Sequence, residues 1–263
     1  MKRESIGSDI FFPSDPEDLR SIIDGSLELS YSPAGSCGTI IVPHGEYGVT
    51  APLAGAAWKA ASRQQASLIL LLLPVHSPVS SQNEGLWIPS LTALSSPLGE
   101  VPVSNPLTKT ACFREDHQYV WEEPALDTAL PYISVLFPGI PVLPVFCAGH
   151  TSRVAASLEE LISHLSTLSV LFVVSSNMSG HEPPETAQAH LDAAVSLLTA
   201  TDRAEGHEPL LEPWRRGRVS MCNPASLEAL RRGVMKGRSY RLLGHACSPE
   251  HLDRITAYAS FAG

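Results

Sequence analysis

The stretch that decides the fold of this chain is G-T-I-I-V-P-H-G, residues 38–45. The β-branched run from Gly38 to Val42 predicts a buried strand that ends at a proline and a histidine. The same order recurs where the leucines of Leu68–Leu73 are followed by Pro74, Val75 and His76. The carboxyl ends of neighbouring parallel strands meet at one crevice, where ligands bind. We therefore expect His44 and His76 to approach each other, although they are far apart in sequence.

Strands and helices alternate along the rest of the chain. Short apolar runs predict further strands at Pro141–Phe146, Val170–Ser175, Tyr240–His245 and Ile255–Phe261. Helical spacing of apolar residues predicts helices that begin near Pro16 and that cover Ala51–Ala61, Ser157–Leu168, Ala187–Leu198 and Pro224–Met235. This alternation predicts an α/β fold with three layers, α/β/α, around a mostly parallel central sheet. We expect residues 1–263 to form one domain, in which the Pro- and Ser-rich segment from Pro74 to Trp121 is irregular.

The composition narrows the classes of function. A formal net charge of −9 makes the surface a poor match for a nucleic-acid backbone. The single basic cluster, Trp214 to Arg218, is typical of a solvated loop edge. Five widely spaced cysteines without a CxxC pair argue against a disulfide framework. We find neither a secretory signal nor an apolar run of the roughly 20 residues that a membrane span needs, so we expect a soluble, cytoplasmic protein that binds neither nucleic acid nor membranes.

Several segments, taken in order, resemble the Memo family, which includes the bacterial proteins called AmmeMemoRadiSam system protein B. The Phe12–Leu19 segment is similar to the family's opening "YPADPEEL", and Ile40–Tyr47 is similar to "IIAPHAGY". Pro74–Ser77 stands where the family has "GPSHH". The remaining similar segments are Ser96–Val103 ("TPLGEVPV"), Val173–Asn177 ("VVSSD") and the closing strand Ala257–Ala262. The resemblance is collinear and covers nearly the whole chain.

This resemblance implies the fold of LigB-type extradiol dioxygenases, which use non-haem Fe(II). It also implies a mononuclear metal site whose ligands are His44, His76 and Cys222. Two imidazoles and one thiolate suit Fe(II) first, with Cu or Zn as alternatives, and three protein ligands leave one position open. Cys222 also precedes the helix predicted from Pro224, whose N-terminus would favour the thiolate. From the residues alone, a small buried hydrophobe is the other interpretation of Cys222.

The chain departs from the family pattern around these ligands. The family's "EHSLE" is replaced by Glu123-Pro124-Ala125-Leu126-Asp127, so a histidine is lost. The family's "SSDxSH" becomes Ser175-Ser176-Asn177-Met178-Ser179-Gly180-His181, in which Asn177 replaces an acid and Gly180 displaces the histidine. We take His181, Glu123 and Asp127 as the candidate catalytic acids and bases, with His117 as a substitute. Surface positions are expected for His150, His164, His190, His207 and His251.

Three functions follow as hypotheses. The first is a metal-dependent redox enzyme of the dioxygenase-like kind, and the second is a non-catalytic module that binds a small-molecule or peptide ligand on a degenerate fold of that type. The thinned set of acids and bases motivates the second hypothesis. The third, which the name of the similar bacterial proteins suggests, is a role in a radical-SAM-linked pathway. The chain lacks the three-cysteine motif of a radical-SAM enzyme, so that role would be as a protein partner.

Overall fold

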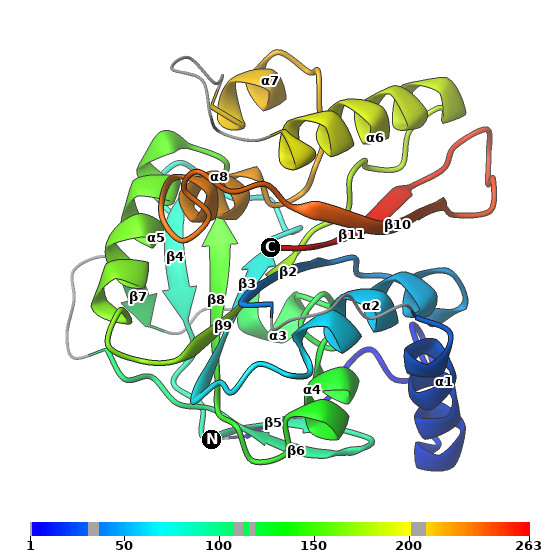
Figure 1. Cartoon of the computed structure of the whole chain (residues 1–263), viewed down its shortest axis with the longest axis vertical. Coiled ribbons are helices and arrows are strands. Elements are labelled where there is room, and N and C mark those ends of the chain that lie inside the picture. Colours follow the sequence, from blue (N-terminus) through cyan, green and yellow to red (C-terminus); the bar gives the residue numbers. More distant parts are fainter. Residues whose placement is uncertain (1, 31–36, 108–112, 116–118, 201–208) are drawn as a thin grey trace.

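An eight-stranded sheet forms the middle layer of the molecule, with helices on both of its faces (Figure 1). The computed structural model describes residues 2–30, 37–107, 113–115, 119–200 and 209–263. The strand order is β10-β11-β2-β9-β3-β8-β4-β7. The bounds are β2 Thr39–Val42, β3 Leu68–Pro74, β4 Gly85–Ile88, β7 Phe113–Glu115, β8 Val142–Ala148, β9 Val170–Ser175, β10 Arg241–Cys247 and β11 Ala257–Ala262. The pairs β2–β9, β9–β3 and β3–β8 are parallel, which confirms the predicted α/β class with a mostly parallel centre.

The leucine run of β3 shows why this strand lies at the centre of the sheet. Leu68, Leu70 and Leu72 pack into the core on one face, together with helices α5 (Ser152–His164), α6 (Pro184–Thr199), α7 (Leu211–Arg215) and α8 (Pro224–Arg232). The alternate residues Ile69, Leu71 and Leu73 pack into the opposite core. That core includes helices α1 (Pro16–Glu28), α2 (Tyr47–Ala61) and α4 (Leu130–Leu136). Because successive side chains of a strand point to opposite faces, an uninterrupted apolar run fits only a strand covered on both faces.

Helix α1 begins where its sequence predicts. The Asp15 side chain accepts hydrogen bonds from the backbone N–H groups of Glu17 and Asp18, and Pro16 occupies the first turn. Leu19 and Ile23, four residues apart, are fully buried. Helix α5 begins at Ser152, earlier than the predicted Ser157, because the Thr151 side chain caps it by accepting from the Val154 N–H.

The prediction that the segment from Pro74 to Trp121 is irregular was wrong. It contains β4 and β7 of the main sheet, the short helix α3 (Tyr119–Glu122), and β5 (Ala93–Ser96) and β6 (Gly99–Pro102) of a second sheet. Strand β1 (Lys2–Arg3) pairs with β5 and completes this three-stranded sheet. These strands have two to four residues. Runs that short carry no readable periodicity, and pairing with distant strands decides their structure.

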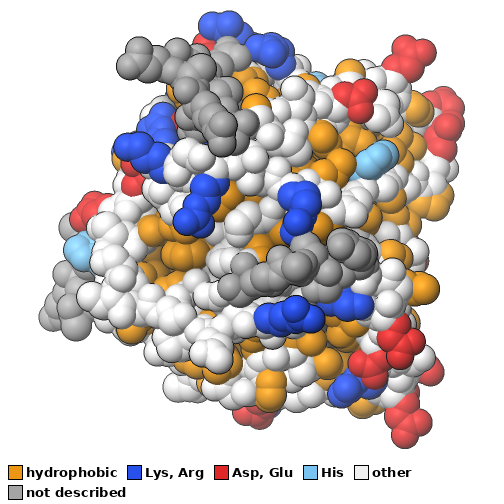
Figure 2. All heavy atoms as spheres, viewed as in Figure 1, with side chains coloured by type: hydrophobic (Ala, Val, Ile, Leu, Met, Phe, Trp, Pro, Cys, Tyr) orange, Lys and Arg blue, Asp and Glu red, His pale blue; other side chains and the backbone are white. Residues whose placement is uncertain are grey.

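Charged side chains are distributed unevenly over the surface. On the face drawn in Figure 2, Lys and Arg side chains are interspersed with apolar and neutral ones, and Asp and Glu side chains gather along one edge of the view. Within the ranges that the structure describes, no helix is both long and apolar enough to cross a membrane.

Candidate metal centre

The carboxyl ends of three neighbouring strands bring the candidate ligands together. His44 follows β2, Asn177 follows β9 and His76 follows β3, and these strands are adjacent in the sheet. Gly45 has a φ of 142°, which turns the chain away directly after His44. Cys222 comes from the loop before α8, and its backbone N–H donates to the carbonyl of Asn177. The expected approach of the two histidines therefore occurs, with the sulfur beside them.

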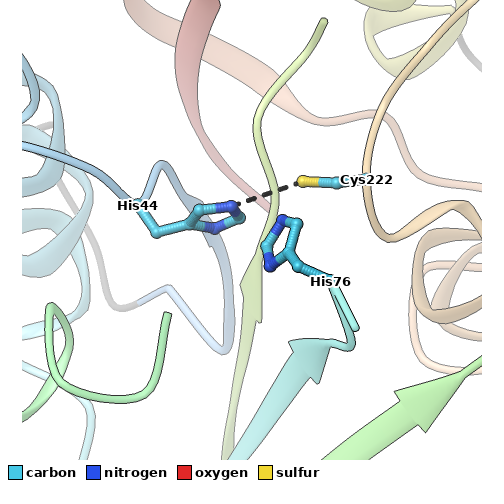
Figure 3. A group of neighbouring side chains, drawn as sticks. All are labelled: His44, His76 and Cys222. Atoms are coloured by element: carbon cyan, nitrogen blue, oxygen red, sulfur yellow. Dashed lines mark hydrogen bonds between the residues drawn. The ribbon is translucent and has the colours of Figure 1, made fainter. Parts of the chain in front are cut away.

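The three side chains converge on one point (Figure 3). One ligand atom each from His44, His76 and Cys222 can be chosen so that all lie within 4.8 Å of one another. The Nε2 atom of His44 is 3.5 Å from the sulfur of Cys222. The two imidazole rings meet edge to face, with centroids 5.0 Å apart and an interplanar angle of 74°. His44 is buried and the side chain of His76 is 45% exposed, so the cluster opens to solvent on the His76 side.

Each imidazole is oriented by a hydrogen bond at its Nδ1 atom. Nδ1 of His44 is 2.9 Å from the hydroxyl of Ser175, the last residue of β9. Nδ1 of His76 lies 2.9 and 3.0 Å from the two carboxylate oxygens of Glu123, which also accepts from the His76 backbone N–H. In both rings Nε2 is therefore the nitrogen that remains for a ligand. A carboxylate behind a histidine is the usual support of a metal-bound imidazole.

The Cys222 sulfur also contacts the segment that follows β9. The backbone N–H of Asn177 donates to it at 3.0 Å, and the hydroxyl of Ser176 is 3.8 Å away. The Asn177 side chain contacts a different residue: its Oδ1 accepts a hydrogen bond from the backbone N–H of His44. Asn223, the residue after the cysteine, is buried and donates to the carbonyls of Leu72 and Ser175. These contacts fix the cysteine loop against the ends of β3 and β9.

The electrostatics of the cluster favour a thiolate. Burial raises the pKa of Cys222, but the charge of His44 and hydrogen bonds to His44 and His76 outweigh it and lower this pKa to about 5. Hydrogen bonds to Cys222 and Glu123 raise the pKa of His76 to about 10 against the opposing effect of burial. Without a metal, these shifts favour a thiolate at Cys222 beside an imidazolium at His76. Binding a metal to His76 requires release of that proton.

The donor set, and the distance between His44 and Cys222 within it, fit one transition-metal ion. A tetrahedral ion with bonds of about 2.05 Å to nitrogen and about 2.3 Å to sulfur separates those two donors by about 3.6 Å. The observed separation between His44 Nε2 and Cys222 Sγ is 3.5 Å. Two imidazoles with one thiolate suit Fe(II), Cu and Zn, and hard cations such as Mg²⁺ prefer oxygen ligands.

The structure places the candidate acids and bases in different surroundings. Glu123 is buried against His76. Burial alone would raise the pKa of Glu123, but the hydrogen bond to His76 outweighs it and lowers this pKa below the ordinary value. Asp127 is buried in an ion pair with Arg3 and also accepts from the Ile6 N–H. His181 is exposed, and the ligand cluster found among the described residues does not include it. His117 lies outside the described residues.

The expected surface position of His150 was wrong. This residue follows Gly149 at the end of β8, the strand next to β3, and it is only partly exposed. Its ring packs on Trp214 of α7, with centroids 4.7 Å apart. Burial, followed by the charge of nearby His76, lowers the pKa of His150. The signal was available in the sequence, because a strand followed by glycine and histidine resembles the pattern at His44 and His76.

The expected surface position of His190 was also wrong, and the sequence did not point to Ser175 at all. His190 is partly buried, with Nδ1 2.7 Å from a carboxylate oxygen of Glu182 and Nε2 3.1 Å from the carbonyl of Gly217. His164 and His251 are exposed, as expected, and His207 lies outside the described residues. The role of Ser175 could not be predicted from the sequence, where it is simply the last residue of a strand. Its hydroxyl matters because the fold brings it beside His44.

A three-layer α/β fold with two histidines and a cysteine converging at the carboxyl edge of its sheet defines a candidate mononuclear metal-binding protein. A sequence model described as "Memo-like protein" matches residues 3–260, so the chain belongs to the Memo family. Among its relatives is a MEMO1 family protein of Methanopyrus kandleri, 24% identical over 99% of this chain and 98% of the relative. A MEMO1 family protein of Desulfurococcus amylolyticus is 24% identical over 98% of both chains. One of Thermotoga neapolitana is 25% identical over 94% of this chain and 93% of the relative.

Proposed function

We propose that this protein binds one transition-metal ion through His44, His76 and Cys222 and uses it for redox chemistry on a small molecule, in a dioxygenase-like manner. One observation carries the proposal: three ligand atoms converge, and both imidazoles present Nε2 because Ser175 and Glu123 occupy their Nδ1 atoms. Fe(II) is the first choice of metal and Cu is the redox-active alternative. Zn suits the same three ligands but would not perform redox chemistry.

The chemistry divides between the metal and the chain. A bound redox-active metal would supply electron exchange with oxygen and a substrate at the position that three protein ligands leave open. The chain keeps the imidazoles fixed and the sulfur ionised, through the Asn177 N–H and the two histidines. The exposed edge of His76 gives a small molecule access from one side.

A second candidate function is a ligand-binding module without turnover. The contacts of the two candidate carboxylates favour it. Both carboxylates that the sequence offers as bases are engaged, Glu123 with His76 and Asp127 with Arg3. Pro124, Asn177 and Gly180 stand where the family pattern has proton-transferring or ligating groups. A site with these replacements can still bind metal while lacking a group that moves protons during turnover.

Metal analysis of anaerobically purified protein tests the metal site. We expect about one equivalent of metal in the wild type and in the exposed-site control His164→Ala, and loss of most of it in His44→Ala. Equal metal content in wild type and His44→Ala would contradict the site. Oxygen consumption of the Fe(II)-loaded protein with a panel of small reductants separates the two functions. Turnover that disappears in Cys222→Ser supports the enzyme, and its absence in fully loaded wild type supports the binding module.

A further inference from the structure

The segment that leads from α8 into β10 exposes three basic side chains, Lys236, Arg238 and Arg241. They lie in a stretch, residues 229–249, that contains no Asp or Glu, although the whole chain has 27 acidic and 18 basic residues. Apolar and small residues separate the three, so no continuous basic run marks them in the sequence. This segment is therefore locally basic in a chain whose formal net charge is −9.

The fold anchors the segment and turns its charges outward. Met235 and Tyr240 are buried in the core beside the cations, and the backbone N–H of Tyr240 donates to the carbonyl of Leu198. Only five residues separate the first cation from the last, so their Cα atoms lie within about 18 Å of one another. Figure 1 shows the segment crossing the middle of the view, and Figure 2 shows Lys and Arg side chains in this part of the face, away from the edge where Asp and Glu gather.

The three cations lack partners within the chain. Lys236, Arg238 and Arg241 form no hydrogen bond and no ion pair with any residue that the structure describes. Basic side chains elsewhere pair with carboxylates, as in Lys2–Glu100 at 2.6 Å, Arg20–Asp24 at 2.8 Å and Arg153–Glu84 at 3.4 Å. An anion from outside the chain can therefore meet the three cations without displacing an internal partner.

The cations lie at the opposite edge of the sheet from the metal ligands. Arg241, the first residue of β10, pairs with Ala262, which in turn pairs with Ile40 near the start of β2. His44 follows the other end of β2. A partner that binds at these cations leaves the metal centre open, and its binding does not depend on a metal.

The overall charge of the chain selects among anionic partners. A nucleic acid or a membrane extends beyond the cations and meets the acidic remainder of the molecule. A short acidic peptide contacts the cations alone, because charges farther away than the Debye length, about 8 Å at physiological ionic strength, are largely screened. Arginine also matches carboxylates well, since its planar fork binds them with two parallel hydrogen bonds.

We propose that Lys236, Arg238 and Arg241 form a docking surface for an acidic segment, rich in Asp and Glu, of a partner protein. The two guanidinium groups bind carboxylates of the segment, and the ammonium group of Lys236 adds a third positive charge.

Fluorescence anisotropy of a labelled hexaglutamate peptide, titrated with the full chain, tests the partner class. We expect binding that weakens when the salt is raised from about 0.01 M to about 0.15 M, because the Debye length then falls from about 30 Å to about 8 Å. A single-stranded oligothymidylate, and phosphatidylcholine vesicles that contain phosphatidylserine, should bind more weakly than the peptide at the same salt. Tighter binding of either would overturn the acidic peptide as partner, and so would absence of peptide binding at low salt.

The triple variant Lys236→Gln/Arg238→Gln/Arg241→Gln tests the location. It should weaken hexaglutamate binding about tenfold, since each exposed charge pair contributes modestly and three are lost. All three side chains are exposed, so the variant should keep the circular dichroism spectrum of the wild type. Unchanged peptide binding in this folded variant would overturn the docking surface.

The triple variant Lys2→Gln/Arg20→Gln/Arg153→Gln is the matched control. It removes the same residue types and the same charge, but from cations that are already paired with carboxylates. It should retain most of the peptide binding. An equal loss in both triple variants would show that the net charge of the chain, and not the surface beside β10, governs the binding, which would also overturn the proposal.

Discussion

The hydrogen bond between Glu123 and His76 is the contact at the residue scale on which the geometry of the site depends most. A carboxylate that accepts from an imidazole N–H fixes both the tautomer and the ring plane. The same carboxylate also accepts from the backbone N–H groups of His76 and Ala125, so it joins two segments that are far apart in sequence. The sequence pointed to Glu123 as a catalytic acid or base, and its contacts in the structure are those of a positioning residue.

Replacing Glu123 by glutamine should therefore weaken metal binding. An amide is a poorer and uncharged acceptor for the His76 N–H, and loss of such an outer partner typically reduces metal affinity by about 10–100-fold. Competition between Glu123→Gln and a chromophoric chelator for Zn²⁺ measures the change. The adjacent, exposed Glu122→Gln is the matched control and should stay close to wild type. Equal affinity in Glu123→Gln and Glu122→Gln would show that the carboxylate does not support a metal ligand.

Cys222 should react as a thiolate over an unusual range of pH. Because its pKa is lowered to about 5, the thiolate is nearly fully formed from pH 6 upward, and protonation removes it as the pH falls through 5. Alkylation of metal-free protein by iodoacetamide should thus proceed at a nearly constant rate between pH 6 and 8. Burial raises the pKa of Cys247, so its rate should climb steeply in the same range. Peptide mass spectrometry of the two sites makes the comparison.

The variant His76→Ala provides the control for this pH profile. It removes a hydrogen bond and a positive charge from the sulfur, so the alkylation profile of Cys222 should move toward higher pH. A Cys222 profile that climbs tenfold per pH unit in wild type, like an ordinary thiol, would contradict the thiolate.

At the scale of elements, a buried ion pair ties the first strand to the segment that carries Glu123. Arg3 of β1 and Asp127 are each about 1% exposed, and their side chains meet at 2.9 Å. Arg3 also donates to the carbonyl of Glu123. The second sheet is thereby connected to Glu123, the residue that supports His76 in the candidate metal centre. Asp127 is buried because it is the partner of Arg3 in this connection.

Removing one partner of this pair should cost far more than removing both. Arg3→Met leaves an uncompensated buried carboxylate and should lower the free energy of unfolding by about 3–5 kcal/mol. The double variant Arg3→Met/Asp127→Leu should recover much of that loss. Arg20→Met breaks an exposed pair with Asp24 and should cost less than about 1 kcal/mol. Urea unfolding measures all three, and a double variant as unstable as Arg3→Met would show that the charge of Asp127 is not the cause.

At the scale of the whole molecule, the order of strands decides which residues meet. Strand β9 lies between β2 and β3 in the sheet, although it comes much later in the sequence than either of them. Their order places Asn177 between the two histidines, and it places the loop of Cys222 above the ends of β9 and β3. It also places His150 of the next strand at the rim of the same site.

The sequence by itself determined the long buried strands, the helix that Asp15 caps and the three candidate ligands. Apolar runs and strand-end histidines are local patterns, and family resemblance supplied Cys222. The tertiary structure alone decided the short strands of the Pro74–Trp121 segment, the pairing of Asp127 with Arg3 and the burial of His150 against Trp214. The physical reason is the same in each case: partners distant in the chain make these contacts, and no local periodicity or spacing records a partner that only folding brings near.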